Sequence, residues 1–208
     1  IINATGLVAA PGFIDVHTHD DLELLRNPAM AAKISQGVTT VIIGNCGISA
    51  APATLKSDAP DPMNLLGAKS EFIFGQLRDY IGAFNVKHAN VNVAALVGHT
   101  TLRNNVMDNL ARAANADEIA AMQQQLEQAI SQGALGLSTG LAYHNAKCAP
   151  EQEIHAFGDI LKKYDALYTT HLRTEVDGVL TAMDEAFAME THFGIKVIIS
   201  HLKCAGKN

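Results

Sequence analysis

Short apolar runs alternate with longer amphipathic stretches along most of the 208-residue chain. The apolar runs are rich in β-branched residues and end in turn residues, which is typical of buried strands in a parallel sheet. We expect six such strands, at residues 13–16, 38–43, 91–97, 134–138, 166–170 and 196–200.

The stretches between these runs have the apolar spacing of amphipathic helices. We expect helices at residues 22–36, 71–84, 117–132, 151–164 and 176–193. Asp117 is placed to cap the third helix, and Gly194 is placed to end the last one. Residues 48–66 are too long for a tight connection and predict a loop insertion.

Strand and helix alternate throughout, and each helix is long enough to connect two parallel strands. A doubly wound open sheet is the rival architecture, but it would be expected to carry a Gly-rich phosphate loop after the first strand. That position holds His17-Thr18-His19 instead. We therefore predict a parallel (β/α)8 TIM-type barrel, of which residues 11–208 form about the first six βα units. Residues 1–10 read as a β-like lead-in, the tail of a small β-domain.

The chain starts without Met and stops directly after the sixth predicted strand. This pattern predicts a portion of a longer protein. A barrel that lacks two strands exposes two sheet edges, so we expect these residues alone to be inactive.

Composition narrows the range of partners. The formal charge of −6 provides no basic patch, which argues against nucleic acid and against an anionic membrane surface. No stretch approaches the roughly 20 apolar residues of a membrane span, and the N-terminus does not resemble a signal peptide. Three widely spaced cysteines indicate a reducing compartment rather than a disulfide framework. We expect a cytoplasmic protein.

Potential metal ligands lie at the ends of four of the predicted strands. His17 and His19 follow the first strand, and residues at i and i+2 of an extended chain point to the same side. Cys46, His171 and His201 follow the second, fifth and sixth strands. In an α/β barrel all five lie on the C-terminal rim, where active sites are built.

A single histidine or cysteine at a strand end is usually structural. Five at one rim are harder to explain that way, and imidazole with thiolate is a zinc-type ligand set. The sequence therefore predicts a zinc site. We expect the other histidines and cysteines to be non-ligands, namely His88, His144, His155, His192, Cys148 and Cys204, with His99 left open.

Several segments resemble the N-acyl-D-amino-acid deacylase (D-aminoacylase) group of the metal-dependent amidohydrolase superfamily. They are residues 10–19, 37–41, 44–47, 96–99, 136–143, 170–173 and 200–203. The His-Thr-His start marks only the superfamily. The Gly-Asn-Cys-Gly segment together with the Ser-Thr-Gly-Leu run is much more specific.

This resemblance implies a division of the ligands between two positions. Most relatives with two metals bridge them with a carbamylated lysine at the end of strand four. The fourth predicted strand of this chain contains no lysine, and Cys46 is expected to replace that bridge. By the resemblance, Cys46, His171 and His201 hold one tight zinc ion. His17 and His19 then lie at a second, weaker position.

The resemblance also implies other roles. Tyr143 and Lys203 match positions that face the carboxylate and carbonyl of the substrate, although the loop after Tyr143 departs from the usual pattern. His99 and Arg173 have either a functional or a structural role. Asp20 or Glu175 is expected to orient the imidazoles.

The general base of this superfamily is an aspartate after strand eight, which would lie beyond residue 208. Asp15, Asp20 and Asp21 come much earlier in the chain, and we expect them to form structural hydrogen bonds at the rim.

The implied reaction is zinc-dependent hydrolysis of small-molecule N-acyl-D-amino acids to a carboxylate and a D-amino acid. Two alternatives stay open. One is a dihydroorotase- or hydantoinase-like enzyme for cyclic amides, which would require a carbamylated lysine. The other is an inactive metal-binding fragment that needs the missing part of the barrel.

Overall fold

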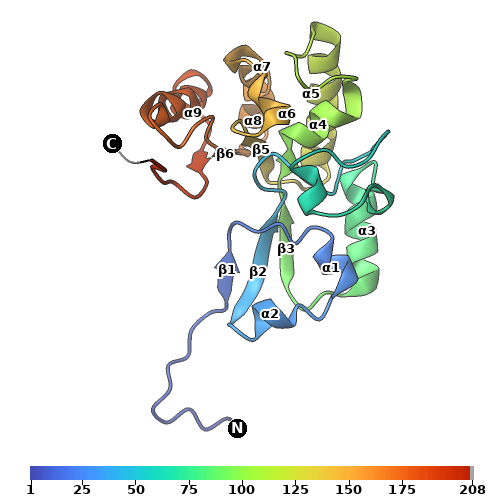
Figure 1. Ribbon diagram of the computed structural model, residues 1–208. Coiled ribbons are helices and arrows are strands. Elements are labelled where there is room, and N and C mark those ends of the chain that lie inside the picture. The colour runs from blue at the N-terminus through green and yellow to red at the C-terminus, as the bar shows by residue number, and fades with distance from the viewer. Residues whose placement is uncertain (207–208) are drawn as a thin grey trace.

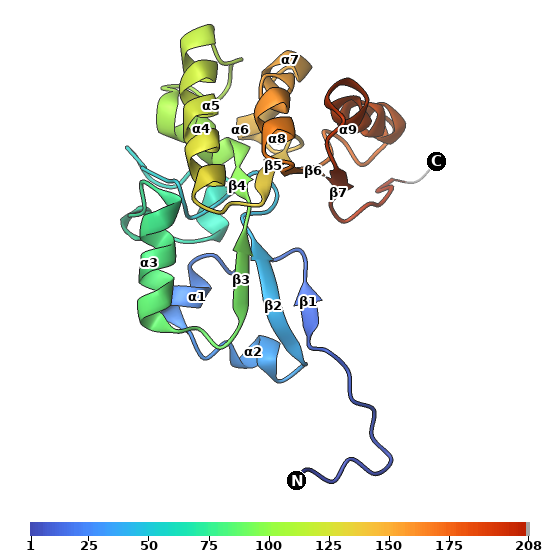
Figure 2. The same cartoon turned by 180° about the vertical axis from the view of Figure 1, so that it is seen from behind.

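The computed structural model describes residues 1–206, and its strands form two parallel sheets in chain order, one of three strands and one of four. The strands are β1 (Phe13–Asp15), β2 (Val38–Ile43), β3 (Asn92–Ala95), β4 (Val97–Gly98), β5 (Gly136–Gly140), β6 (Leu167–His171) and β7 (Val197–Ile199). Figure 2 shows β3 leading directly into β4. Backbone hydrogen bonds continue through the junction, because the amide of Leu96 donates to Ile43 O and that of Leu135 donates to Ala95 O. The two sheets are thus joined where β3 leads into β4, and β3 and β4 together correspond to the single strand expected at residues 91–97. Each of the six expected strands is present.

Helices follow most of the strands, as a βα repeat requires (Figure 1). They are α1 (Glu23–Arg26), α2 (Ala31–Ile34), α3 (Leu77–Lys87), α4 (His99–Val106), α5 (Ala116–Ser131), α6 (His144–Lys147), α7 (Glu151–His155), α8 (Gly158–Lys163) and α9 (Val179–Phe193). Two 3-10 turns, η1 (Met63–Leu65) and η2 (Lys69–Glu71), lie in the long connection after β2. No helix within residues 1–206 is both long and apolar enough to cross a membrane.

The core lies between the sheet and its helices. On α5, Met122, Leu126 and Ala129 form one buried stripe at helical spacing. Leu137 of β5 is also fully buried in the same hydrophobic cluster. Each fully buried leucine contributes about 1.5–3 kcal/mol relative to an exposed one, so this packing fixes the helices against the strands.

The opposite face of the sheet borders a cavity of about 240 Å³. Apolar side chains from successive strands line it, and His17, Asn45 and His201 border the same space. The parallel strands bring their carboxyl ends to one edge, which places these polar residues together.

The helix predictions were right about position and wrong about several boundaries. The expected helix 22–36 is two short helices, α1 and α2. Pro28 lies between them, has no backbone N–H, and disfavours helical geometry in the residue before it. Met30 is left-handed, with φ 46°. The expected helix 151–164 is divided into α7 and α8, and Ala156 and Phe157 between them still have helical dihedrals.

Other boundaries moved for identifiable reasons. α3 begins at Leu77 rather than residue 71, because Phe72 and Phe74 point into the core and Gly75 lies between them and the helix. Gly194 ends α9 in a left-handed conformation with φ 70°, as predicted. α4 was not predicted. Residues 1–10 contain no strand in this structure. That they form the tail of a small β-domain stays a prediction.

Candidate metal centre

Cys46 is held by an unusual loop at the end of β2. Gly44, Cys46 and Gly47 all have positive φ values, of 75°, 53° and 79°. This conformation turns the chain sharply and buries the thiol, leaving Cys46 only 2% exposed. The Cys46 sulfur lies 3.2 Å from His17 Nε2 and 3.5 Å from His201 Nε2.

His17 and His19 follow β1, and their rings meet edge to face with centroids 5.6 Å apart. The amide of His17 donates to Asp15 Oδ1 at 3.2 Å. Lys33 braces this segment, because its ammonium lies 2.7 Å from Asp15 and 3.0 Å from Asp20. The two aspartates therefore form structural ion pairs at the rim, as expected.

His171 and His201 come from the ends of β6 and β7, and their ring centroids are 4.4 Å apart. Glu175 lies beside both rings, with its Oε1 3.0 Å from His201 Nδ1 and 3.8 Å from His171 Nε2. Of the two carboxylates expected to orient the imidazoles, Glu175 is the one that reaches them. Asp20 is bonded to Thr18 and Lys33 instead.

Two groups of potential ligand atoms result, each with all atoms within 4.8 Å of one another. One consists of His17, Cys46 and His201, and the other of His171, Glu175 and His201. The predicted tight site combined Cys46 with His171 and His201, so the distances group the donors differently and make His201 common to both. Among the described residues, His19 belongs to neither group.

The electrostatics of the cluster favour neutral imidazoles. Burial lowers the pKa of His17 to about 4, and the neighbouring His19 and His201 act in the same direction. Burial also lowers the pKa of His19 and His171. A neutral imidazole has a free lone pair, so these side chains are in the protonation state that a metal requires.

Burial raises the pKa of the Cys46 thiol to about 11, and a hydrogen bond from Tyr143 opposes this shift. A divalent cation would reverse the balance, because a coordinated thiol loses its proton outright. Two buried nitrogens, Nδ1 of His19 and Nδ1 of His171, also have no hydrogen-bond partner among residues 1–206. Neutral imidazoles, a buried thiol and unpartnered nitrogens at one rim fit zinc.

The two predicted substrate-binding residues border this cluster. The ring centroids of Tyr143 and His171 are 4.8 Å apart. Lys203 Nζ lies 2.5 Å from Glu175 Oε2 and 3.3 Å from His201 Nδ1. Their role toward a substrate stays a prediction.

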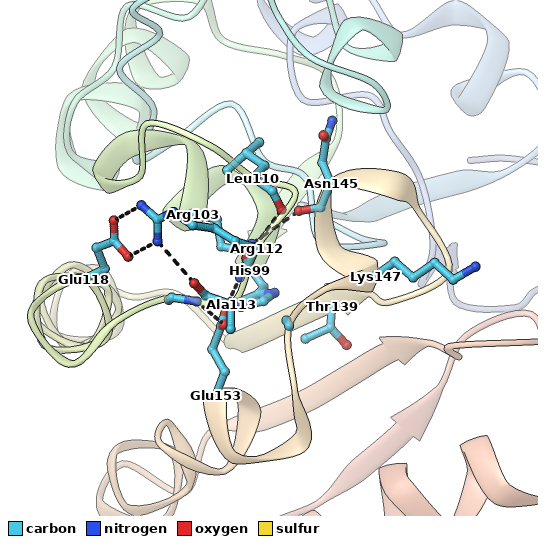
Figure 3. Close-up of polar contacts among 12 residues, drawn as sticks. His99, Arg103, Leu110, Arg112, Ala113, Glu118, Thr139, Asn145, Lys147 and Glu153 are labelled. Carbon is cyan, nitrogen blue, oxygen red and sulfur yellow. Dashed lines mark hydrogen bonds and ion pairs between the residues drawn. The ribbon is translucent and has the colours of Figure 1, made fainter.

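His99 and Arg173, whose roles were left open, make structural contacts. His99 is fully buried, and its Nε2 lies 3.0 Å from Glu153 Oε1 (Figure 3). Arg173 pairs with Glu185 at 2.6 Å and donates to two backbone carbonyls. Within residues 1–206, neither belongs to the donor groups, nor do the histidines and cysteines expected to be non-ligands.

Asp21 is buried behind the Cys46 loop. Its carboxylate accepts from the amides of Ala50 at 3.1 Å and Gly44 at 3.4 Å. Burial raises its pKa to about 7, and these backbone hydrogen bonds oppose the shift. Asp21 therefore has the structural role expected of it.

Comparisons with known proteins agree with this geometry. The model of the amidohydrolase family matches residues 1–196. The chain is 48% identical over 208 residues to N-acyl-D-aspartate deacylase of Alcaligenes xylosoxydans xylosoxydans. The matched region covers 100% of this chain and 42% of that relative. It thus spans about two fifths of the length of the curated relatives it matches.

Solved structures extend the likeness to three dimensions. A D-aminoacylase structure concerned with a binuclear metal centre, one-metal activation and second-metal attenuation superposes with a TM-score of 0.91 at 44% identity, over 95% of this chain and 41% of the other. N-acyl-D-glutamate deacylase from Bordetella bronchiseptica, complexed with zinc and a phosphonate inhibitor, gives 0.86 at 41% identity, over 93% and 40%. These neighbours confirm the expected barrel architecture, of which this chain contributes six parallel strands.

The match of the family model along nearly the whole chain, on a fold that gathers histidines and a cysteine at one rim, shows that this chain belongs to the amidohydrolase family.

Proposed function

We propose that the protein hydrolyses the amide bond of N-acyl-D-amino acids, with zinc, to a carboxylate and a D-amino acid. The observation that carries the proposal is the buried Cys46 thiol, with its sulfur 3.2 Å and 3.5 Å from two imidazole nitrogens. The names of its relatives, deacylases of N-acyl-D-aspartate and N-acyl-D-glutamate, supply the substrate class.

In this proposal the tight zinc is held by Cys46, His171 and His201, and His17 and His19 lie at a second, weaker position. When bound, zinc acidifies a water molecule and polarises the carbonyl of the amide. The described residues supply the surroundings for that chemistry. Glu175, whose Oε1 lies 3.0 Å from His201 Nδ1 and 3.8 Å from His171 Nε2, places a negative charge beside these two imidazoles.

Tyr143 and Lys203 are proposed to bind the carboxylate and carbonyl of the substrate. Lys203 supplies a positive charge beside the cluster, and Tyr143 supplies a hydroxyl. Burial raises the pKa of Tyr143 to about 12, so this hydroxyl stays protonated and can donate a hydrogen bond. The proton of the attacking water passes to a carboxylate, expected beyond residue 208, and then to the leaving amine.

The test uses the full-length protein and a panel of N-acetyl-D-amino acids with neutral, aspartate and glutamate side chains. We expect zinc in the wild type and hydrolysis of at least one D-substrate but not of its L-counterpart. Cys46→Ala should lose zinc and at least about 100-fold in kcat/KM, more than the loss typical of an outer-shell residue. Cys148→Ala, which changes an exposed cysteine outside both donor groups, is the matched control.

Two results would contradict the proposal. Full zinc occupancy and activity in Cys46→Ala would remove the thiolate from the site. Hydrolysis of hydantoin or dihydroorotate in place of the linear amides would assign the protein to the cyclic-amide branch of the family.

A further inference from the structure

The loop that carries Cys46 depends on outside support. Three of its four residues, Gly44, Cys46 and Gly47, have left-handed backbones. That conformation is readily adopted by glycine but is unfavourable for cysteine, whose Cβ crowds the following carbonyl. The loop therefore holds its shape through contacts with the neighbouring strands.

Ser138 of β5 makes two of these contacts with one hydroxyl. Its Oγ accepts from the amide of Gly47 at 3.0 Å and donates to the carbonyl of Gly44 at 2.5 Å. These two backbone groups bracket Asn45 and Cys46. Ser138 is fully buried, so water does not compete for either bond.

Backbone contacts also hold the Cys46 loop in place. The carbonyl of Gly47 accepts from the amides of Thr100 at 2.8 Å and Thr101 at 3.3 Å. Gly98 and Gly140 lie so close to the loop that a Cβ on either would overlap its backbone. The loop thus fits between the ends of β4 and β5, with the Ser138 hydroxyl joining its two ends.

We propose that Ser138 is a positioning residue for the metal ligand Cys46. It acts through the loop backbone, because its two hydrogen bonds fix the left-handed turn that aims the sulfur at His17 and His201. The inference rests on the proposed function, since it assumes that Cys46 binds the metal.

The experiment measures zinc affinity in the full-length protein by competition with a chelator. It also records the thiolate-to-metal charge-transfer band after loading with Co²⁺. Ser138→Ala should bind zinc about 10- to 100-fold more weakly and should lose or shift the band. Ser138→Thr, which keeps the hydroxyl, should return the affinity to within a few-fold of wild type.

Thr139→Val is the matched control. Thr139 is also fully buried on β5, but its hydroxyl bonds Tyr168 at 2.9 Å and Thr170 at 2.8 Å rather than the Cys46 loop. We expect this variant to be less stable than wild type yet to keep its zinc affinity and charge-transfer band. If Ser138→Ala is too unstable to purify, Ser138→Cys, whose thiol is a weak donor, takes its place. A version in the Cys46→Ala background then reports any binding by the new thiol.

Wild-type affinity and an unchanged band in Ser138→Ala would overturn the inference and leave the proposed function intact. Equal losses in Ser138→Ala and Thr139→Val would also overturn it, because the effect would then be general to buried hydroxyls of β5. Zinc binding by wild type that does not depend on Cys46 would overturn the inference and the proposed function together.

Discussion

Glu153 is the buried charge on which several segments depend. Its carboxylate accepts from the guanidinium of Arg103 and contacts His99 (Figure 3). It also accepts from the amide of Ala114. Arg103 in turn donates to the carbonyls of Leu110 and Arg112. One buried ion pair therefore joins α4, the loop after it and α7.

Removing this charge should be costly. We expect Glu153→Gln to lower the free energy of unfolding by about 3–5 kcal/mol, because it leaves the buried Arg103 without its counter-charge. Urea denaturation at pH 7 measures the change. Glu127→Gln is the control, since Glu127 pairs with Lys163 on the surface and should cost less than about 1 kcal/mol. Equal effects in the two variants would contradict a special role for the buried pair.

The same residue predicts an acid-dependent loss of stability. Burial raises the pKa of Glu153, but His99 and Arg103 outweigh burial and bring it to about 2. Its folded pKa lies below the unfolded value of 4.5, so the stabilisation is complete above about pH 4.5 and is lost as the pH falls toward 2. Unfolding free energies at pH 7, 5, 4 and 3 should fall more steeply for wild type than for Glu153→Gln. Parallel curves would refute the assignment.

At the scale of single residues, the sequence predicted which potential ligands lie together better than it predicted how they are grouped. Four of the five predicted ligands, all except His19, enter the two donor groups because parallel strands end at one rim. Their partition was not predictable from strand order, since it depends on the left-handed turn at Cys46. Ser138 carried no sequence signal beyond the Ser-Thr-Gly run, because its contacts are to backbone atoms distant in sequence.

At the scale of elements, strands were more predictable than helices. The run from Val38 to Ile43 is β-branched throughout and was predicted with its exact bounds. Helix ends depend on local hydrogen bonds that compete with the apolar pattern. α5 illustrates this, because its cap is Asn115 rather than the expected Asp117. The Asn115 side chain accepts from the amide of Glu118 at 2.9 Å, and the Glu118 carboxylate accepts from the amide of Asn115.

This capping box gives an element-level prediction. Asn115→Ala should lower the free energy of unfolding by about 1 kcal/mol, because it leaves the Glu118 amide without its acceptor. Asp117→Ala should change it by less than about 0.5 kcal/mol, since Asp117 lies in the first turn without capping it. Chemical denaturation of the two variants distinguishes the caps. A larger effect from Asp117→Ala would restore the original expectation.

At the scale of the whole molecule, the series of parallel strands within residues 1–206 begins at β1 and ends at β7, and neither of these two strands has a partner on its outer side in that part of the chain. Large apolar side chains are exposed on both, with Ile14 59% exposed on β1 and Ile198 48% exposed on β7. The order of the strands follows from the right-handed βα repeat and was predictable. What covers these edges in the protein is a property of contacts that the apolar pattern does not encode.

An uncovered strand edge with apolar side chains pairs readily with another chain. We therefore expect residues 1–208, expressed alone, to self-associate in a concentration-dependent way and to show no amidohydrolase activity. Size-exclusion chromatography with light scattering measures the association. Ile14→Lys with Ile198→Lys should reduce it, because a charge on an edge strand opposes pairing. Leu65→Lys is the control, since Leu65 is 67% exposed but lies on η1, away from both edges. A monomeric, active chain, or equal relief of association by Leu65→Lys, would show that the open edges are not what limits the isolated chain.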